Sequence, residues 1–242
     1  MAQIKRAMIL AAGMGTRLGD ITHRIPKPLV AVGDTCPLIR TLELLEQAGI
    51  EEVAINLYRF ADVVRSAVDD IEISIKITYF HEEELLETGG AVKNASSFFN
   101  NEPFLLVNGD VMWMEEYYPL LQPLLNHFNP IECDSLLTLV PLYTTKLFRD
   151  PRGDFALDNN FITVPEDLTK APYVYAGIQV MHPRLIQDVA EDKFSLYPCF
   201  LKAIEKGRLK GVVYNGPWVD IGTPNGLNVA RSMMTESVKQ AV

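Results

Sequence analysis

Short apolar runs recur through the first half of the chain and alternate with helical patterns. Four such runs, each of five or six mostly apolar residues, have the composition of strands buried on both faces: 7–12, 52–56, 104–108 and 136–140. Between the first two, residues 38–48 carry leucines at helical spacing. Strands that alternate with helices predict βαβ units around a mainly parallel sheet. The sequence therefore predicts an α/β fold.

The second half of the chain contains more turn residues and shorter runs. The stretches RGD at 152–154 and DNN at 158–160 flank short segments such as 161–164, which predicts a small β-hairpin inserted on the main sheet. The second half also contains predicted strands at 173–181 and 209–214 and predicted helices at 183–189, 198–206 and 225–234. In the first half, a further strand is predicted at 71–79 and helices at 62–68, 90–99 and 117–128. Because neither a repeat nor a linker interrupts the pattern, we expect one domain over 1–242, a Rossmann-like three-layer sandwich with a mixed, mainly parallel sheet.

Charge and cysteine content exclude several classes of protein. The net charge of −9 and the isoelectric point near 5.0 argue against a duplex-DNA binder, whose surface needs an excess of Lys and Arg. Three widely spaced cysteines without a CxxC pair predict neither a disulfide framework nor a zinc site. No apolar segment approaches the roughly 18–20 residues of a membrane span. We therefore expect a soluble, cytoplasmic protein that binds neither nucleic acid nor membrane.

A glycine-rich loop follows the first predicted strand. Residues 10–18 read LAAGMGTRL, and residues 25–29 read IPKPL. Glycine permits close backbone approach, so the amides of such a loop can hold a phosphate. The third glycine of a dinucleotide-binding fingerprint would fall at Leu18, and the Walker pattern GxxxxGK[ST] is absent. Two cations remain for phosphate oxygens: Arg17, and Lys27, which two flanking prolines hold in place.

Two aspartates follow short apolar segments far apart in the sequence. Asp110 comes directly after FLLVNG, where the carboxyl end of a parallel strand would face a ligand crevice. Asp220 lies in PWVDIGT. Either aspartate alone could simply cap a turn. Magnesium, however, typically takes one or two carboxylates together with water and substrate phosphate oxygens. We therefore interpret the pair as a candidate Mg²⁺ site.

Two further segments place small residues where a ligand could approach the backbone. Residues 87–90 read ETGG before a predicted helix, so that a flat base could lie against them with Thr88 and the neighbouring amides at its edge. Thr88 could equally cap the helix. Residues 175–177 read YAG. Gly177 could allow a substrate to approach the backbone closely, or it could only relieve packing inside the fold.

The segment AAGMGTRL…PKPL closely resembles the nucleotide-binding loop of the sugar-phosphate nucleotidylyltransferases. The resemblance implies a fold of the nucleotide-diphospho-sugar transferase type, with a nucleotide-binding half at about 1–130 and a sugar-binding half at about 131–242. It also implies an enzyme that takes a nucleoside triphosphate and a sugar 1-phosphate, with Mg²⁺ held by Asp110 and Asp220. The residues implied for catalysis are Arg17, Lys27, Asp110 and Asp220. Those implied for the nucleotide are Ala11, Ala12, Gly13, Met14, Gly15, Thr16, Arg17, Lys27, Thr88, Gly89 and Asn108, and those for the sugar are Glu87, Gly177 and Lys170.

A narrower resemblance covers nearly the whole chain. LLVNGDV, RGDF, AGIxVxHP, FSL and WVDIGT together are similar to the N-acetylmuramate 1-phosphate uridylyltransferase branch of that family. This similarity implies UTP as the nucleotide and a role in cell-wall recycling. Three departures leave base and sugar open: Ala91 stands where another glycine is expected after ETGG, Leu57 rather than histidine follows Asn56, and residues 79–85 differ.

Three alternatives therefore remain open. Another sugar-1-phosphate nucleotidylyltransferase, of the mannose-1-phosphate guanylyl- or glucose-1-phosphate thymidylyl/uridylyltransferase type, would use the same loop. So would a phosphocholine or polyol-phosphate cytidylyltransferase, although AGIxVxHP and WVDIGT favour a sugar. A catalytically inactive regulatory module should have lost a phosphate cation or a metal carboxylate, and all four of these residues are present. The sequence does not predict the oligomeric state.

Overall fold

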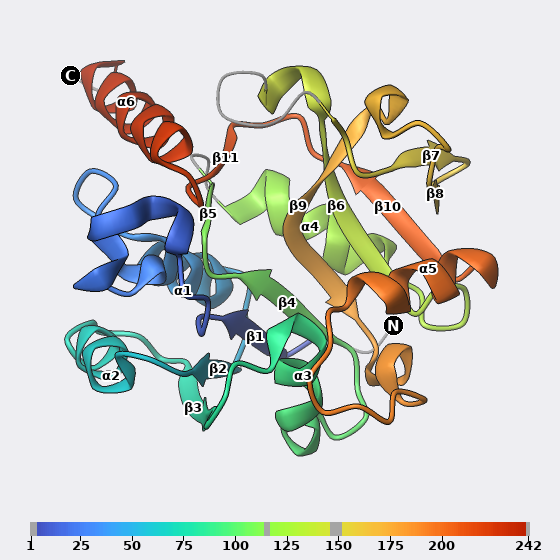
Figure 1. The fold of residues 1–242 in the computed structure, drawn as a ribbon, viewed down its shortest axis with the longest axis horizontal. Helices are drawn as coiled ribbons and strands as arrows, with labels where there is room; N and C mark the ends of the chain where they lie inside the picture. Colours follow the sequence, from blue (N-terminus) through green and yellow to red (C-terminus); the bar gives the residue numbers. More distant parts are fainter. Residues whose placement is uncertain (1–3, 114–116, 146–151, 241–242) are drawn as a thin grey trace.

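The computed structural model describes residues 4–113, 117–145 and 152–240. Within these residues the centre of the fold is a nine-stranded sheet in the order β3-β2-β1-β4-β9-β6-β10-β8-β7 (Figure 1). Its strands are β1 (Arg6–Leu10), β2 (Glu52–Leu57), β3 (Lys76–His81), β4 (Phe104–Asn108), β6 (Ser135–Pro141), β7 (Ala156–Asp158), β8 (Phe161–Thr163), β9 (Tyr173–Met181) and β10 (Leu209–Val213). A separate two-stranded sheet pairs β5 (Val111–Trp113) with β11 (Trp218–Asp220).

The large sheet is mixed but mainly parallel, as the alternation of strands and helices predicts. β1 pairs in parallel with both β2 and β4, which places Asn56 and Asn108 on either side of Leu10. β2 is parallel to β3, and β6 is parallel to β10. β9 runs antiparallel between β4 and β6, and β7 and β8 form the predicted hairpin at one end of the sheet. The carboxyl ends of β1, β2 and β4 therefore meet at one edge.

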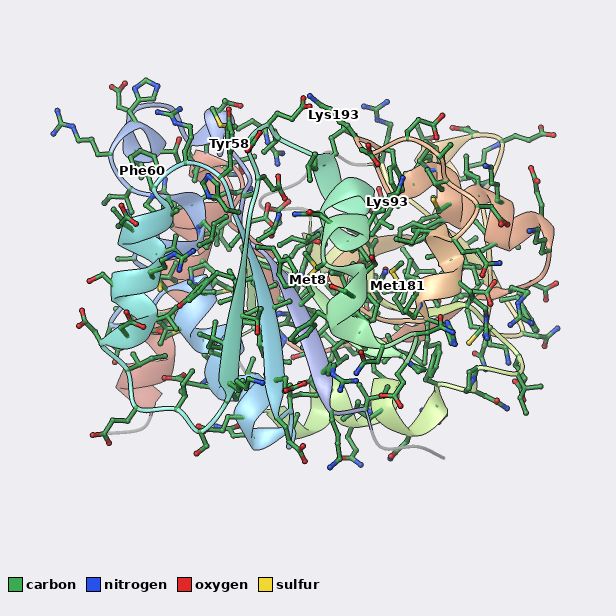
Figure 2. The ribbon with its side chains drawn as sticks, turned by 90° about the horizontal axis from the view of Figure 1, so that it is seen from below. Met8, Tyr58, Phe60, Lys93, Met181 and Lys193 are labelled. Atoms are coloured by element: carbon green, nitrogen blue, oxygen red, sulfur yellow. The ribbon has the colours of Figure 1, made fainter. Side chains whose placement is uncertain are left out.

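Helices cover both faces of the sheet, so the three-layer prediction is confirmed. They are α1 (Pro37–Gln47), α2 (Ala61–Asp69), α3 (Glu87–Asn94), α4 (Tyr117–His127), α5 (Tyr197–Glu205) and α6 (Pro224–Gln240). Alternate residues of β1 separate two cores: Ala7 and Ile9 pack with residues of α1, α2 and α4, whereas Met8 packs with residues of α3 and α5. Figure 2 shows the strands β1 to β3 between α2 on one side and α3 on the other.

The strand predicted at 71–79 starts later than its alternating isoleucines indicate. β3 begins at Lys76, which is the partner of Glu52, the first residue of β2. Residues before Lys76 therefore have no neighbouring strand to pair with. Ile71 and Ile73 are half-buried and pack against the core outside the sheet. Their apolar alternation reflects this packing and not a ladder of hydrogen bonds.

Two predicted helices are also shorter in the structure. The helix predicted at 90–99 corresponds to α3, which ends at Asn94, followed by the 3-10 turn η3 (Ser96–Phe99). The helix predicted at 183–189 is the single 3-10 turn η6 (Pro183–Ile186). There the side chain of His182 accepts a hydrogen bond from the Arg184 amide, which caps the turn.

The cysteines and the helices agree with the expectations from composition. Cys36, Cys133 and Cys199 are buried and form no disulfide. Burial raises the pKa of all three thiols, which keeps them protonated and weakly nucleophilic at neutral pH. Among the helices of the described ranges, none has the length and apolarity needed to cross a bilayer.

Asp134 ties three segments together at the start of β6. Its Oδ1 accepts hydrogen bonds from Arg184, in η6, and from Arg208, 2.8 Å away, just before β10. Burial alone would raise the pKa of this carboxyl, but the hydrogen bonds from Arg208 and Arg184 outweigh burial and lower it. A lowered folded-state pKa means that Asp134 stabilises the fold above its unfolded-state pKa. That stability is lost as the pH falls through the folded-state pKa.

We expect Asp134→Asn to lower the free energy of unfolding at pH 7 by about 2–3 kcal/mol. Breaking a fully buried ion pair costs about 3–5 kcal/mol, and the cost here should be smaller because the side chains of Arg184 and Arg208 are partly exposed. Urea unfolding at pH 7 and at pH 3 would measure this, and the difference from wild type should shrink at pH 3. Glu132→Gln, which breaks the more exposed pair with Lys210, is the control and should leave stability close to that of wild type. Equal stability of Asp134→Asn and wild type at pH 7 would contradict the interpretation.

Candidate active site

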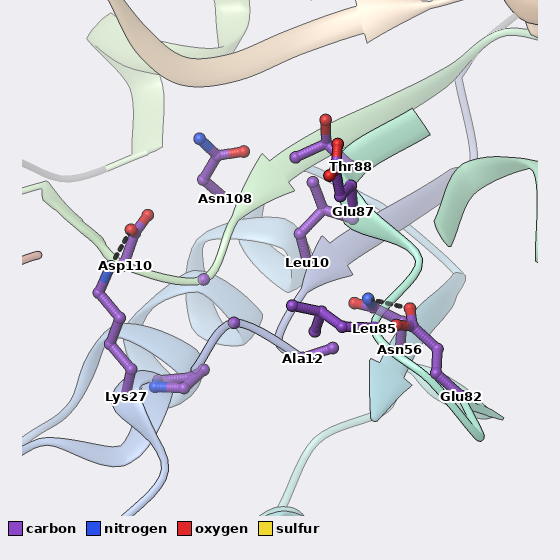
Figure 3. A pocket seen from close by; sticks show the side chains of 13 residues that line it. Leu10, Ala12, Lys27, Asn56, Glu82, Leu85, Glu87, Thr88, Asn108 and Asp110 are labelled. Atoms are coloured by element: carbon purple, nitrogen blue, oxygen red, sulfur yellow. Dashed lines mark hydrogen bonds and ion pairs between the residues drawn. The ribbon is translucent and has the colours of Figure 1, made fainter. Parts of the chain in front are cut away.

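A cavity of about 190 Å³ lies at the edge where β1, β2 and β4 end (Figure 3). Its walls are formed by Leu10, Ala12, Gly13, Lys27, Pro28, Asn56, Glu82, Leu85, Glu87, Thr88, Asn108, Gly109 and Asp110. In open α/β sheets this edge is where ligands bind, because the connections on either side leave a crevice there. The predicted loop, the ETGG segment and Asp110 thus border one space.

The loop after β1 folds as a tight turn that leaves amides available. Gly15 has a φ of +63°, and a Cβ there would lie 2.7 Å from the methyl carbon of Thr22, so the turn requires glycine. The Thr22 hydroxyl donates to the Gly15 carbonyl at 2.9 Å. Within the described residues, the amides of Gly13, Met14 and Gly15 donate no hydrogen bond. Such amides can bind an anion.

Lys27 is held beside this loop with most of its side chain out of water. It begins the 3-10 turn η2 (Lys27–Leu29), between Pro26 and Pro28. Its side chain is 9% exposed, and its ammonium forms an ion pair with the carboxylate of Asp110 (Figure 3). A lysine buried to this degree is normally paired with an acid, as Lys27 is here.

The two-stranded sheet brings the two aspartates together. β11 pairs antiparallel with β5, so Asp220 lies opposite Val111, and the Ile221 amide donates to the Asp110 carbonyl at 3.0 Å. The Asp220 Oδ1 accepts from the Gly222 amide at 2.6 Å. Burial raises the pKa of Asp220, and the charge of Asp110 raises it further. The pair is therefore a place where an additional cation would be favoured.

Gly222 marks the point where the charged groups converge. A Cβ built on Gly222 would lie 2.7 Å from Asp220 Oδ1, 2.8 Å from Arg17 Nη2 and 2.9 Å from Lys27 Nζ. Arg17 belongs to η1 (Thr16–His23), so the site joins the first and last parts of the chain. The absent side chain of Gly222 makes room for these three groups.

The donor set of the two aspartates fits a magnesium ion. Both provide carboxylate oxygens, which are the ligands that magnesium prefers, and the ion usually completes its shell with water and phosphate oxygens. In the described part of the chain, no group of three or more His, Cys, Asp or Glu side chains could hold a metal. The candidate metal site thus rests on Asp110 and Asp220 alone.

A second cavity of about 260 Å³ adjoins the first. It is lined by Thr88, Asn108, Asp154, Phe155, Tyr175, Ser195, Leu196, Tyr197 and Phe200. Thr88 and Asn108 line both cavities and therefore lie at their junction. The Asp154 carboxylate accepts from the Tyr175 amide at 2.9 Å, which joins the RGDF turn to β9. Burial raises the pKa of the Tyr175 phenol, so it stays neutral.

The structure brings most of the sequence-predicted residues together. Those that line the first cavity are Ala12, Gly13, Lys27, Glu87, Thr88, Asn108 and Asp110, and Arg17 and Asp220 meet at Gly222. Ala11, Met14, Gly15 and Thr16 shape the loop without lining the cavity. Gly177, with a φ of +77°, lies behind Asn108: a Cβ there would be 3.1 Å from the Asn108 Cβ and amide nitrogen. It sets the position of Asn108 by close packing.

Gly89 lies against Phe194 and does not line the first cavity, so its predicted contact with a flat base stays a prediction. A Cβ on Gly89 would lie 2.3 Å from the ring of Phe194, and the Gly89 and Gly90 amides both donate to the Phe194 carbonyl. The Thr88 hydroxyl accepts from the Leu196 amide at 2.9 Å. The small residues of ETGG therefore allow α3 to pack against the segment around Phe194.

Lys170 lies apart from the other predicted residues. It ends the 3-10 turn η5 (Leu168–Lys170), and its side chain is 80% exposed, with its ammonium 3.7 Å from Asp167. It lines neither of the two cavities. Placement beside a substrate is therefore not supported for Lys170.

Sequence reasoning did not select a buried polar pair at the wall of the first cavity. Asn56 accepts from the Ala11 amide at 2.8 Å and donates to the Glu82 carboxylate at 2.7 Å. Glu82 also accepts from the Leu86 amide and is only 2% exposed. These bonds connect the carboxyl ends of β1, β2 and β3. A polar residue near the end of the buried strand β2, and an acid directly after β3, were the available signal.

Glu87, which lines the first cavity, adopts a backbone conformation with positive φ. Its φ is +62°, which costs a residue with a Cβ about 1–3 kcal/mol and recurs at functional sites. We expect Glu87→Gly to raise the free energy of unfolding by about 1 kcal/mol, because relief of strain exceeds the entropy cost of glycine. Urea unfolding would measure the change. Asn160→Gly, at a left-handed residue in the β7–β8 turn, is the control and should gain less, because asparagine tolerates this conformation. If the Glu87→Gly protein is less stable than wild type, the backbone of Glu87 is not strained.

A crevice at the edge of parallel strands, with an amide-rich loop, two cations and two carboxylates, is typical of enzymes that act on phosphorylated substrates. The family model described as nucleotidyl transferase matches residues 6–141, more than half of the chain. The chain belongs to this family and is a nucleotidyltransferase.

Known proteins resemble the chain over almost its full length. An N-acetylmuramate alpha-1-phosphate uridylyltransferase of Caulobacter vibrioides is 29% identical, over 96% of this chain and 98% of that protein. A D-glycero-alpha-D-manno-heptose 1-phosphate guanylyltransferase of Campylobacter jejuni is 28% identical, over 90% and 95%. Among solved structures, HddC from Yersinia pseudotuberculosis complexed with GMP-PN superimposes with a TM-score of 0.73 at 26% identity and covers 96% of this chain and 100% of that chain. These matches confirm the predicted fold type.

Proposed function

We propose that the chain transfers a nucleoside monophosphate from a nucleoside triphosphate to a sugar 1-phosphate and releases pyrophosphate. The observation that carries this proposal is the convergence of Arg17, Lys27 and Asp220 on Gly222, beside Asp110. Two of these groups, Lys27 and Asp110, line the first cavity, which meets a second one at Thr88 and Asn108. Two adjoining cavities with a charged border suit two substrates that react at their phosphates.

The reaction is an in-line displacement at phosphorus. A phosphate oxygen of the sugar 1-phosphate forms a bond to the α-phosphorus, the bond from that phosphorus to the bridging oxygen breaks, and pyrophosphate leaves with the electron pair. The nucleophile is already an anion, so no general base is required. Catalysis then consists of positioning and charge neutralisation.

Each charged residue has a role in this scheme. Lys27 neutralises charge on the α-phosphate, to which its side chain can turn from the cavity wall. Arg17 and the amides of residues 13–16 receive the pyrophosphate. Asp110 and Asp220 would hold Mg²⁺, which supplies further charge neutralisation across the phosphates when it is bound.

The two cavities divide the remaining contacts. The first, with Ala12, Gly13 and the Asn56–Glu82 pair, would take the nucleoside. The second, with the aromatic rings of Tyr175 and Phe200 and the carboxylate of Asp154, would take the sugar. Glu87, at the first cavity near the junction, is proposed to contact the sugar.

UTP and N-acetylmuramate 1-phosphate are the substrates that we propose to test first. The relative in Caulobacter vibrioides, named for this reaction, matches nearly the whole chain. A guanylyltransferase that acts on a heptose 1-phosphate is the second candidate, because the Campylobacter jejuni relative and HddC with GMP-PN are similarly close. The first reaction would place the enzyme in cytoplasmic cell-wall recycling.

A pyrophosphate-release screen tests the proposal. Four nucleoside triphosphates would be combined with N-acetylmuramate, N-acetylglucosamine, glucose, mannose and heptose 1-phosphates, and with phosphocholine, at fixed Mg²⁺. We expect release only when a sugar 1-phosphate is present, and fastest with UTP. Preference for phosphocholine would replace the sugar assignment. Nucleotide binding without release in any combination would point to a regulatory module.

A further inference from the structure

The Lys27 ammonium lies against the same carboxylates that are the candidate metal ligands. It is ion-paired to Asp110, and it lies 2.9 Å from the Gly222 Cβ position, from which Asp220 Oδ1 is 2.7 Å away. Its side chain is almost completely shielded from water. Lys27 is thus the counter-ion of the aspartate pair in this structure.

The Lys27 ammonium and a divalent cation cannot both bind fully to the carboxylates of Asp110 and Asp220. Each needs the oxygens of Asp110, and their like charges repel at short range in a site shielded from water. A cation that binds to the aspartates must therefore share Asp110 with Lys27 or displace the ammonium from it.

The Lys27 ammonium could also occupy a second position, in the first cavity. The backbone of Lys27 is fixed by the flanking prolines, but its side chain also lines the first cavity and carries four rotatable methylene groups. Rotation of the side chain would move the ammonium from Asp110 into that cavity without a change in the backbone. In the absence of a nucleotide the cavity offers the ammonium no phosphate.

We infer that Lys27 competes with the divalent cation for the Asp110–Asp220 pair, and that a nucleotide phosphate draws the ammonium away from it. This inference rests on the proposed function for the nucleotide and on the structure for the ion pair. Its consequence is that the divalent cation and the triphosphate bind cooperatively, because each removes the obstacle to the other.

Removal of the ammonium should strengthen metal binding in the protein without nucleotide. Mn²⁺ serves as the probe, and its free concentration can be followed by electron paramagnetic resonance. We expect Lys27→Met to bind Mn²⁺ about tenfold more tightly than wild type, because the competing charge is gone. Arg17→Met is the matched control: it removes the same charge near Gly222 but no bond to Asp110, so we expect a change below about threefold.

The outcomes separate this inference from the proposed function. If Lys27→Met binds Mn²⁺ no more tightly than wild type, or no more tightly than Arg17→Met, the competition is disproved. Lys27→Gln, which keeps a hydrogen-bond donor without charge, replaces Lys27→Met if thermal unfolding shows that the methionine protein is not folded, and the same expectation applies. Failure of the pyrophosphate screen together with tighter Mn²⁺ binding by the variant would overturn the proposed function and leave the competition standing.

Discussion

Asp110→Asn is expected to release pyrophosphate about a hundredfold or more slowly than wild type, because removal of one preorganised electrostatic contact commonly costs about 2.7–4 kcal/mol of transition-state stabilisation. Asp110 lines the first cavity, pairs with Lys27 and lies close to Asp220. The amide has the size of the carboxylate, so the fold should be preserved. The measurement is turnover at saturating substrates and Mg²⁺, together with urea unfolding.

Asp20→Asn is the control for this experiment. Asp20 belongs to η1, in the same part of the loop as Arg17, but its side chain is fully exposed. We expect wild-type turnover from this variant. Near-normal turnover of Asp110→Asn in an assay supplemented with Mg²⁺ would remove Asp110 from the proposed metal site.

Most of the first half of the fold could be predicted because strands such as β1 and β4 are buried on both faces. β1 and β4 are continuous apolar runs, as expected of parallel strands with helices on either side. The β5–β11 sheet could not be predicted in the same way. Each of its strands has three residues, and the pairing joins Trp113 to Trp218, far apart in the chain. Local sequence patterns carry no information on such a pairing.

The same distinction applies to the candidate site. Arg17, Lys27 and Asp110 lie in local motifs whose residue types indicate phosphate chemistry, and the structure places them at one border. The contact that Gly89 makes with the ring of Phe194, in contrast, joins residues far apart in the chain. A glycine pair before a helix looks alike whether it faces a base or another side chain.

The second cavity was missed for a related reason. Tyr175 and Phe200 come from a strand and a helix with ordinary apolar patterns, which indicate a core. Asp154 lies in the RGDF turn, and its contact with the Tyr175 amide appears only when the turn is folded against β9. When the residues of a cavity wall come from separate elements, the local sequence around each residue does not indicate that they form a cavity.

Gly222→Ala is expected to separate catalysis from stability. The three atoms nearest to the added methyl group would be the tips of flexible side chains, Asp220 Oδ1, Arg17 Nη2 and Lys27 Nζ, at 2.7–2.9 Å. These groups can move aside, so the free energy of unfolding should change by less than about 1 kcal/mol. The displaced charges, however, would no longer meet the phosphates correctly. A misplacement of about 1 Å can cost on the order of a hundredfold in rate, and we expect a loss of that size.

The contrast with Gly226→Ala makes this prediction specific. A Cβ on Gly226 would lie 2.0 Å from the backbone carbonyl oxygen of Asp220, which cannot move without a shift of β11. This variant should therefore lose stability as well as activity, whereas Gly222→Ala should lose activity alone. Turnover and urea unfolding of both proteins would show the difference. If Gly222→Ala keeps the wild-type rate, the positions of the three charged groups around Gly222 are not what the reaction requires.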